Sequence, residues 1–119
     1  MIWNRFKFNE IYLYQKPVDM RKGIDGLGSI VAKEMLLDPG IPNLYLFTNR
    51  SRDKLKILLW ENNGFWVLYK RLQKQRFHWP DWFTDNKITL NQEHCDYLLQ
   101  GINLNGLKPH EKIFAAHHF

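Results

Sequence analysis

The sequence predicts an α+β fold: a single domain in which an antiparallel β-meander of about four strands packs against one main helix, with a second, shorter helix near the C-terminus. Three observations support this prediction. Apolar residues recur at helical spacing between positions 20 and 36, and two strand-like segments flank the dipeptide Asn63-Gly64. A short apolar pattern at 91–100 follows residues that commonly cap helices.

The first strand and the main helix are predicted on either side of Pro17. The stretch "IYLY" gives a strand at about 11–15, since aromatic and β-branched residues are frequent in strands. Asp19 is expected to cap a helix from Met20 to about Leu36, because its carboxylate can accept a first-turn N–H and favours the positive helix end. The inward stripe of this helix comprises Ile24, Leu27, Val31 and Met35.

The glycines in "KPVDMRKGIDGLGSI" allow a second interpretation, a phosphate-binding loop behind a strand. Their order is GxxGxG rather than the dinucleotide GxGxxG, and the chain contains no GK[ST] element. We therefore favour the helix over the nucleotide loop. Each glycine costs a helix roughly 1 kcal/mol relative to alanine. We expect close approach of the helix backbone to the sheet to compensate for this cost.

The remaining strands are predicted at 44–48, 54–60 and 65–72. Asn63-Gly64 tolerates the positive φ values of a tight turn, so the last two strands form a hairpin and the four strands an antiparallel sheet. Alternation of side chains places Trp66 and Lys70 on one face.

The sequence does not decide whether two tryptophans, Trp66 and Trp79, are buried or exposed. Trp66 is a candidate for partial exposure, and Trp79 belongs either to the core or to an exposed aromatic platform. Pro80 makes a regular central strand beside it improbable. The second helix is predicted at about 91–100, with Thr89 or Asn91 as its cap. Its expected inward residues are Cys95, Leu98 and Leu99.

Composition limits the function classes. A chain of 119 residues forms one domain, 1–119, and 45% hydrophobic residues exclude disorder as its default state. No run of eighteen apolar residues is present, and charges interrupt the N-terminus, so we expect a cytoplasmic protein. A single cysteine excludes an intramolecular disulfide and a CxxC zinc site. We expect no metal and no cofactor.

Charge indicates an anionic partner. The chain carries a net charge of +5, while the segment 50–76 alone carries +6. Bases neutralise phosphates and exposed aromatics stack on unpaired bases, so this pattern predicts binding of nucleic acid. The candidate residues are Arg50, Arg52, Lys70, Arg71, Lys74 and Arg76 first, then Trp66 as a stacking residue, with Arg21 and Lys22 ranked below.

Several motifs resemble a known family. The segments "PVDMRKGIDGL" and "FTNRSRDKLKILLWENNGFWVLYKRLQKQRFHWP", and the spacing between them, resemble the TnpB-type accessory protein, the second open reading frame product, of the sixty-six family of bacterial insertion sequences. The match spans roughly 11–80. The chain departs from the motif at two positions: Glu61 stands where the motif has aspartate, and Gln75 stands where it has glycine. The resemblance implies participation in DNA transposition beside a separate transposase. From the basic, aromatic-rich pattern we expect DNA, either transposon ends or non-specific DNA, as a further partner, and a non-catalytic role. The resemblance says little about 81–119.

Two other functions remain open. Arginine, tryptophan and tyrosine are also frequent in protein interfaces, so the same surface suits an adaptor that binds the transposase without touching DNA. A metal-dependent nuclease would need carboxylates converging on divalent ions. The acids considered for this role are Asp19, Asp25, Asp53, Glu61, Asp81 and Asp85. Their spacing matches no recognisable metal-binding pattern, so no catalytic residue is predicted.

Overall fold

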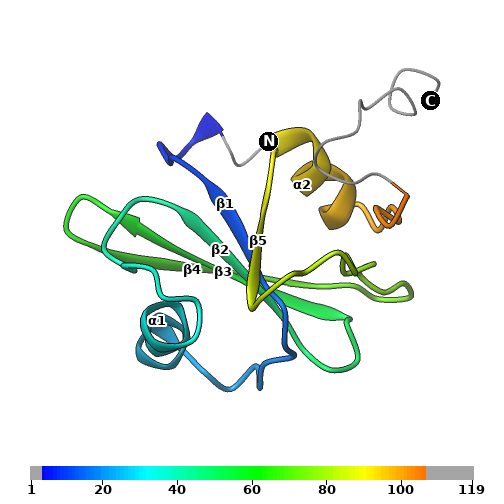
Figure 1. Ribbon diagram of the computed structural model, residues 1–119, viewed down its shortest axis with the longest axis horizontal. Coiled ribbons are helices and arrows are strands. Elements are labelled where there is room, and N and C mark those ends of the chain that lie inside the picture. The colour runs from blue at the N-terminus through cyan, green and yellow to red at the C-terminus, as the bar shows by residue number, and fades with distance from the viewer. Residues whose placement is uncertain (1–3, 107–119) are drawn as a thin grey trace.

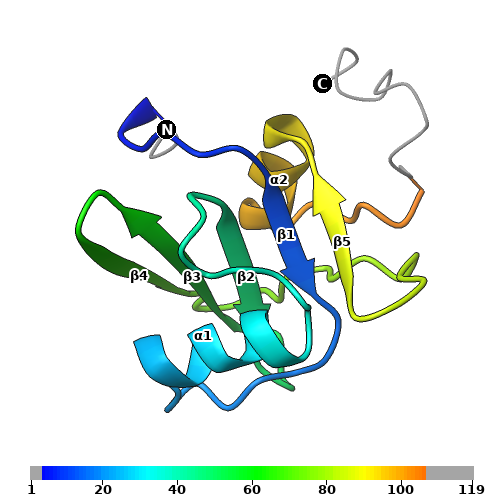
Figure 2. The same cartoon turned by 60° about the vertical axis from the view of Figure 1, so that its left-hand side comes forward.

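The computed structural model describes residues 4–106, which form one five-stranded sheet with a helix on each face (Figures 1 and 2). The α+β class, the main helix and the second helix are thereby confirmed. The strand order is β4-β3-β2-β1-β5. The elements are β1 (Ile11–Tyr14), α1 (Ile24–Lys33), β2 (Leu44–Thr48), β3 (Lys54–Glu61), β4 (Gly64–Arg71), β5 (Lys87–Leu90) and α2 (Gln92–Leu99).

The sheet is mixed, so the prediction of a purely antiparallel, four-stranded meander is wrong in two respects. β1 and β2 pair in parallel, with Ile11 opposite Leu44. This follows from α1, because a helix between two adjacent strands carries the chain back to the starting edge. The fifth strand, β5, pairs antiparallel with β1. It spans only four residues, too few for alternation to reveal from sequence.

The antiparallel hairpin of β3 and β4 is confirmed, but its turn lies one residue earlier than predicted. Glu61 pairs with Gly64, so the loop residues are Asn62 and Asn63. Asn62 has a φ of 54°, in the left-handed region that asparagine tolerates better than most residues. Gly64 is the first residue of β4.

Helix α1 is shorter than predicted, and Asp19 does not cap it. The N-cap residue is Gly23, which makes no side-chain cap bond. The expected close approach of glycine to the sheet is also wrong. A Cβ at Gly28 would have no neighbour within 4 Å, and one at Gly26 would meet the Lys22 side chain rather than a strand.

Helix α2 begins as predicted. The Asn91 side chain accepts a hydrogen bond from the backbone N–H of His94, which identifies Asn91 as the cap, whereas Thr89 lies in β5. Cys95, Leu98 and Leu99 point inward and are buried. Burial raises the pKa of the Cys95 thiol, which therefore stays protonated as a core residue.

The two faces of the sheet carry separate cores. On the face of α1, Leu27 and Val31 pack against Tyr45, Phe47 and Leu58. The other core contains residues of β1 to β3, α2 and the segment 77–83 (Figure 1). Its buried side chains are Ile11, Leu13, Leu44, Leu46, Leu55, Ile57, Leu59, Phe77, Trp79, Leu90, Cys95, Leu98, Leu99 and Leu104.

Trp79 and Trp66, for which the sequence allows either burial or exposure, differ in the structure. Trp79 is 2% exposed, and its indole N–H donates to the carbonyl of Tyr14 at 2.9 Å. Trp66 is 46% exposed, as alternation predicts, and lies on the same face of β4 as Leu68, which packs against the core below α2. Residues 107–119 of the predicted C-terminal tail lie outside the described part of the chain.

Candidate functional site

Two segments far apart in sequence, "PVDMR" at 17–21 and "NRS" at 49–51, meet at one cavity of about 610 Å³. Val18 joins them directly, since its N–H donates to the carbonyl of Thr48 at 2.8 Å. The cavity is lined by Pro17, Val18, Asp19, Met20, Arg21, Asn49, Arg50, Ser51, Lys54 and Tyr69. Both segments belong to the motifs that carry the family resemblance.

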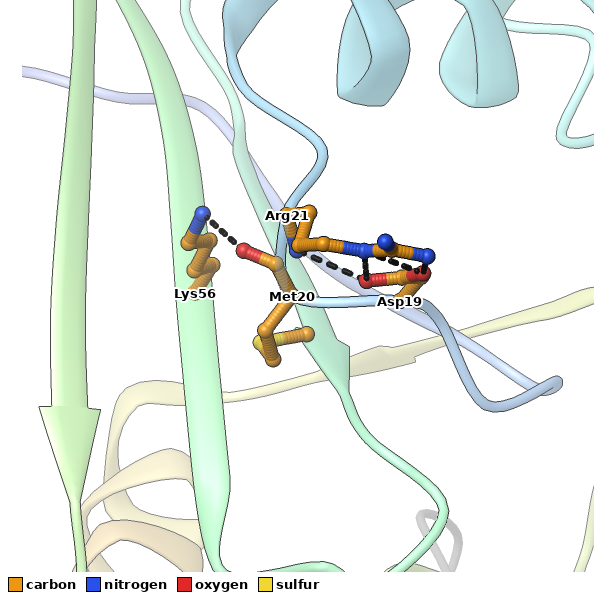
Figure 3. Close-up of polar contacts among 4 residues, drawn as sticks. All are labelled: Asp19, Met20, Arg21 and Lys56. Atoms are coloured by element: carbon orange, nitrogen blue, oxygen red, sulfur yellow. Dashed lines mark hydrogen bonds and ion pairs between the residues drawn. The ribbon is translucent and has the colours of Figure 1, made fainter.

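Lys56 on β3 holds the first segment against the sheet. Its ammonium donates to the carbonyl of Met20 at 2.6 Å and to that of Lys22 at 2.8 Å, as Figure 3 shows for Met20. The same ammonium lies 5.9 Å from the centre of the Tyr69 ring. Lys56 is therefore a structural base whose charge is directed into the protein.

Asp19 and Arg21 form a fork within this segment (Figure 3). Arg21 Nη2 and Nε donate to Asp19 Oδ2 at 2.6 and 3.0 Å, and the Arg21 backbone N–H donates to Asp19 Oδ1 at 2.9 Å. These hydrogen bonds hold the pKa of the Asp19 carboxyl at about 2. The carboxylate is thus charged at neutral pH and is committed to Arg21, which explains why it is not the helix cap.

The turn between β2 and β3 is fixed by its own side chains. Asn49 donates to the Asp53 carboxylate at 2.7 Å and accepts from the Lys54 N–H at 3.1 Å. The hydrogen bond from Asn49 lowers the pKa of Asp53. Arg52 adopts a φ of 59°, which gives the turn its tight bend. This geometry leaves Arg50 exposed beside the cavity.

The segment after β4 runs along the same turn. The N–H groups of Leu72 and Phe77 donate to the carbonyls of Asp53 and Arg52 at 2.8 and 2.7 Å, and Arg76 Nη1 donates to the carbonyl of Ser51 at 2.6 Å. The bases of 71–76 therefore gather at the end of the sheet where the cavity opens. We name this surface the basic end; it comprises Arg21, Arg50, Arg52, Lys54, Arg71, Lys74 and Arg76.

Six of the nine sequence-predicted site residues belong to the basic end, and three do not: Lys70, Trp66 and Lys22. Lys70 projects from the face that carries α2, and its ammonium donates to the carbonyl of Leu99 at 2.8 Å. Trp66 lies near the opposite end of β4, where its indole donates to Glu61 at 2.9 Å and its ring meets Phe6. Lys22 is exposed next to Arg21 and does not line the cavity.

Of the residues that line the cavity, sequence reasoning selected only Arg21 and Arg50 as site residues, and it missed the others, among them Lys54 and Tyr69. Both lie on the α1 side of the hairpin, where Lys56 pairs with Tyr69 and Lys54 with Arg71. The alternation of β3 and β4 contained this signal, because it assigns all four residues to one face once the turn is placed.

Several bases of the basic end are not used by the protein itself. Among residues 4–106, the side chains of Arg50, Arg52, Arg71 and Lys74 make no hydrogen bond or ion pair, whereas those of Arg21 and Arg76 do. Repulsion between these unpaired cations costs stability, and an anion bound between them would relieve it.

We predict that Lys56→Met lowers the free energy of unfolding by about 2 kcal/mol, since it removes two charge-assisted hydrogen bonds at a half-buried position. Urea denaturation measures this loss. Lys54→Met is the matched control, because Lys54 lies on the same face of β3 and its side chain makes no hydrogen bond. Its expected change is within about 0.5 kcal/mol. Equal effects of the two substitutions would contradict the structural role of Lys56.

The described residues contain no group of three or more His, Cys, Asp and Glu side chains that could hold a metal ion. In the same part of the chain, neither helix has the length and apolar character needed to cross a membrane.

The chain is similar to a known protein family and to two curated proteins. A family model described as "IS66 Orf2 like protein" matches residues 9–109, well beyond the 11–80 covered by the recognised motifs. Two similar proteins come from Sinorhizobium fredii: "Uncharacterized protein y4hO", 34% identical over 78% of this chain and 80% of its own length, and "Uncharacterized protein y4jC", 26% identical over 82% and 83%. No solved structure gives a significant match.

Proposed function

Because the chain belongs to the family of IS66 Orf2-like proteins of insertion sequences, we propose that it assists DNA transposition by binding nucleic acid at its basic end. The contacts are made to phosphates by Arg50, Arg52, Arg71 and Lys74, with Arg21 and Lys54 in the cavity between them. Such contacts give affinity without sequence information and position the protein on its DNA.

The observation that carries this proposal is the grouping of unpaired bases around one cavity: Arg50 and Lys54 line it, and Arg71 lies opposite Lys54 in the sheet. The cavity of about 610 Å³ is large enough for a phosphate and part of its sugar, and Ser51 and the exposed Tyr69 are among the residues that line it. Hydroxyls and backbone groups are common phosphate partners beside arginine and lysine. A concave cationic surface also raises the local concentration of an anionic polymer.

The proposed role is non-catalytic. Asp19 and Asp53, the acids nearest the cavity, are both engaged by neighbouring donors, Arg21 and Asn49. We therefore propose that the separate transposase supplies the chemistry and that this protein supplies contacts to DNA.

The test is a binding titration of the purified chain with transposon-end duplex, unrelated duplex and single-stranded DNA over a salt series. We expect binding to all three, with log affinity falling linearly as log salt rises, because counterions are released from each neutralised phosphate. Adding the element's transposase distinguishes the alternative function, a protein adaptor. Capture of the transposase that is insensitive to salt, together with no measurable binding to any DNA, would replace our proposal by the adaptor.

A further inference from the structure

β4 forms an open edge of the sheet over its whole length. It is the outermost strand in the order β4-β3-β2-β1-β5, and in Figure 2 it lies at the margin of the molecule. The Leu72 N–H donates to the Asp53 carbonyl, so even-numbered residues of β4 direct their backbone groups toward β3. The pairing register is constant from Lys54–Arg71 to Glu61–Gly64, without a bulge. The residues with outward N–H and C=O groups are therefore Phe65, Val67, Tyr69 and Arg71.

This edge has few of the devices that prevent strand pairing. Natural proteins protect edges with charged side chains, proline, bulges, very short strands or covering segments. β4 has eight residues and no proline, and no described residue outside β3 forms a backbone hydrogen bond with it. Two of its aromatic side chains are unusually exposed, Trp66 at 46% and Tyr69 at 53%. Its charged residues, Lys70 and Arg71, are both basic and stand at one end.

We propose that β4 pairs antiparallel with β4 of a second copy of this chain, about a two-fold axis through Leu68, which joins two five-stranded sheets into one. In this register Phe65 lies opposite Arg71 and Val67 opposite Tyr69. Every outward N–H and C=O of β4 then finds a partner. Registers centred on Val67 or Tyr69 are shifted by two positions and leave the backbone groups of one outward residue at an end of the strand without a strand partner.

The side chains agree with the same register. Trp66 lies opposite Lys70 in a pair without direct hydrogen bonds, where side chains approach most closely. Phe65 lies opposite Arg71, so each cation of one copy meets an aromatic ring of the other. Cation–aromatic contacts of this kind are attractive. Lys70 and Arg71 of the two copies are kept at opposite ends of the paired strands, which limits repulsion between two chains that each carry +5.

The first test is sedimentation across a concentration series in moderate salt, with a proline placed on each edge of the sheet. Val67→Pro removes an outward N–H and leaves the bonds to β3 intact, so we expect a shift from dimer to monomer. Thr89→Pro is the matched control on the opposite edge. The Gln15 N–H donates to the Asn86 carbonyl, so Thr89 also points its N–H outward, and this variant is expected to remain dimeric. A wild-type chain that is monomeric at every concentration would overturn the proposal.

Cysteine cross-linking tests the register and does not depend on whether the proline variants fold. Only residues near the two-fold axis come within disulfide range of their own copy. Leu68→Cys is therefore expected to form a covalent dimer under mild oxidation, while Val67→Cys and Tyr69→Cys are not; the native Cys95 is buried in all three. Cross-linking strongest at 67 or 69, or at none of the three, would overturn the proposed pairing. Dimer formation should strengthen with salt, the opposite of DNA binding, so failure of one proposal is distinguishable from failure of the other.

Discussion

Joint replacement of Arg50, Arg71 and Lys74 by glutamine is expected to reduce the magnitude of the log-affinity versus log-salt slope for duplex DNA by roughly 2.7, at about 0.9 for each lost phosphate contact. Affinity at low salt should fall for every DNA sequence alike, because phosphate contacts carry no sequence information. Arg52 is left unchanged in this variant, since its φ of 59° makes any substitution there a test of the turn as well.

The variant should fold normally. All three side chains are exposed and make no hydrogen bond or ion pair among the described residues. Substitutions of this kind usually change stability by less than about 1 kcal/mol. Removing mutually repelling cations acts in the stabilising direction, so a higher melting temperature is compatible with the loss of binding.

A charge-matched control separates the basic end from net charge. Replacing Lys7, Lys33 and Lys87 by glutamine removes the same three charges from other parts of the surface. This control is expected to keep most of the slope, losing only long-range attraction. If the two triple variants behaved identically, DNA binding would be a property of the overall charge and the cavity would have no special part in it.

Lys70 illustrates why sequence alone could not choose these residues. It sits beside Arg71 in the chain, but alternation sends it to the other face, where it holds the Leu99 carbonyl at the end of α2. Lys56 likewise looks like one more base in a cationic strand, yet it binds carbonyls 34 and 36 residues away. Which bases serve the fold and which remain for a partner depends on long-range contacts that charge counting does not contain.

The parts of the fold that depend on neighbouring residues were predicted correctly, whereas the parts that depend on contacts between distant segments were not. The β3–β4 hairpin and the Asn91 cap depend on neighbouring residues, and both are found. The parallel pairing of β1 with β2 could have been predicted from the order strand, helix, strand, because this order favours a parallel crossover. α1 begins late because Asp19 bonds to Arg21 and the loop 19–22 is tied down by Lys56, a non-local contact.

Trp79→Ala is expected to produce the largest loss of stability, about 4 kcal/mol, within the range found for truncation of large buried aromatic residues. Trp79 is 2% exposed in the core shared by β1, β3 and α2, so truncation leaves a cavity that the surrounding sheet cannot close. It also removes the donor from the Tyr14 carbonyl, where β1 ends. The melting temperature should fall by on the order of 15 °C for a domain of this size.

Two further variants show how much of this loss of stability comes from the indole N–H and how much from burial of the ring: Trp79→Phe and Trp66→Ala. Phenylalanine fills most of the space but has no indole N–H, so we expect an intermediate loss of about 1–2 kcal/mol from the unsatisfied carbonyl and the smaller ring. Trp66→Ala removes an exposed ring and its bond to Glu61, with an expected cost below about 1 kcal/mol. Thermal and urea denaturation of the three variants measure the order. A Trp79→Ala protein as stable as Trp66→Ala would show that Trp79 lies at the surface, and would return it to the set of residues able to stack on bases.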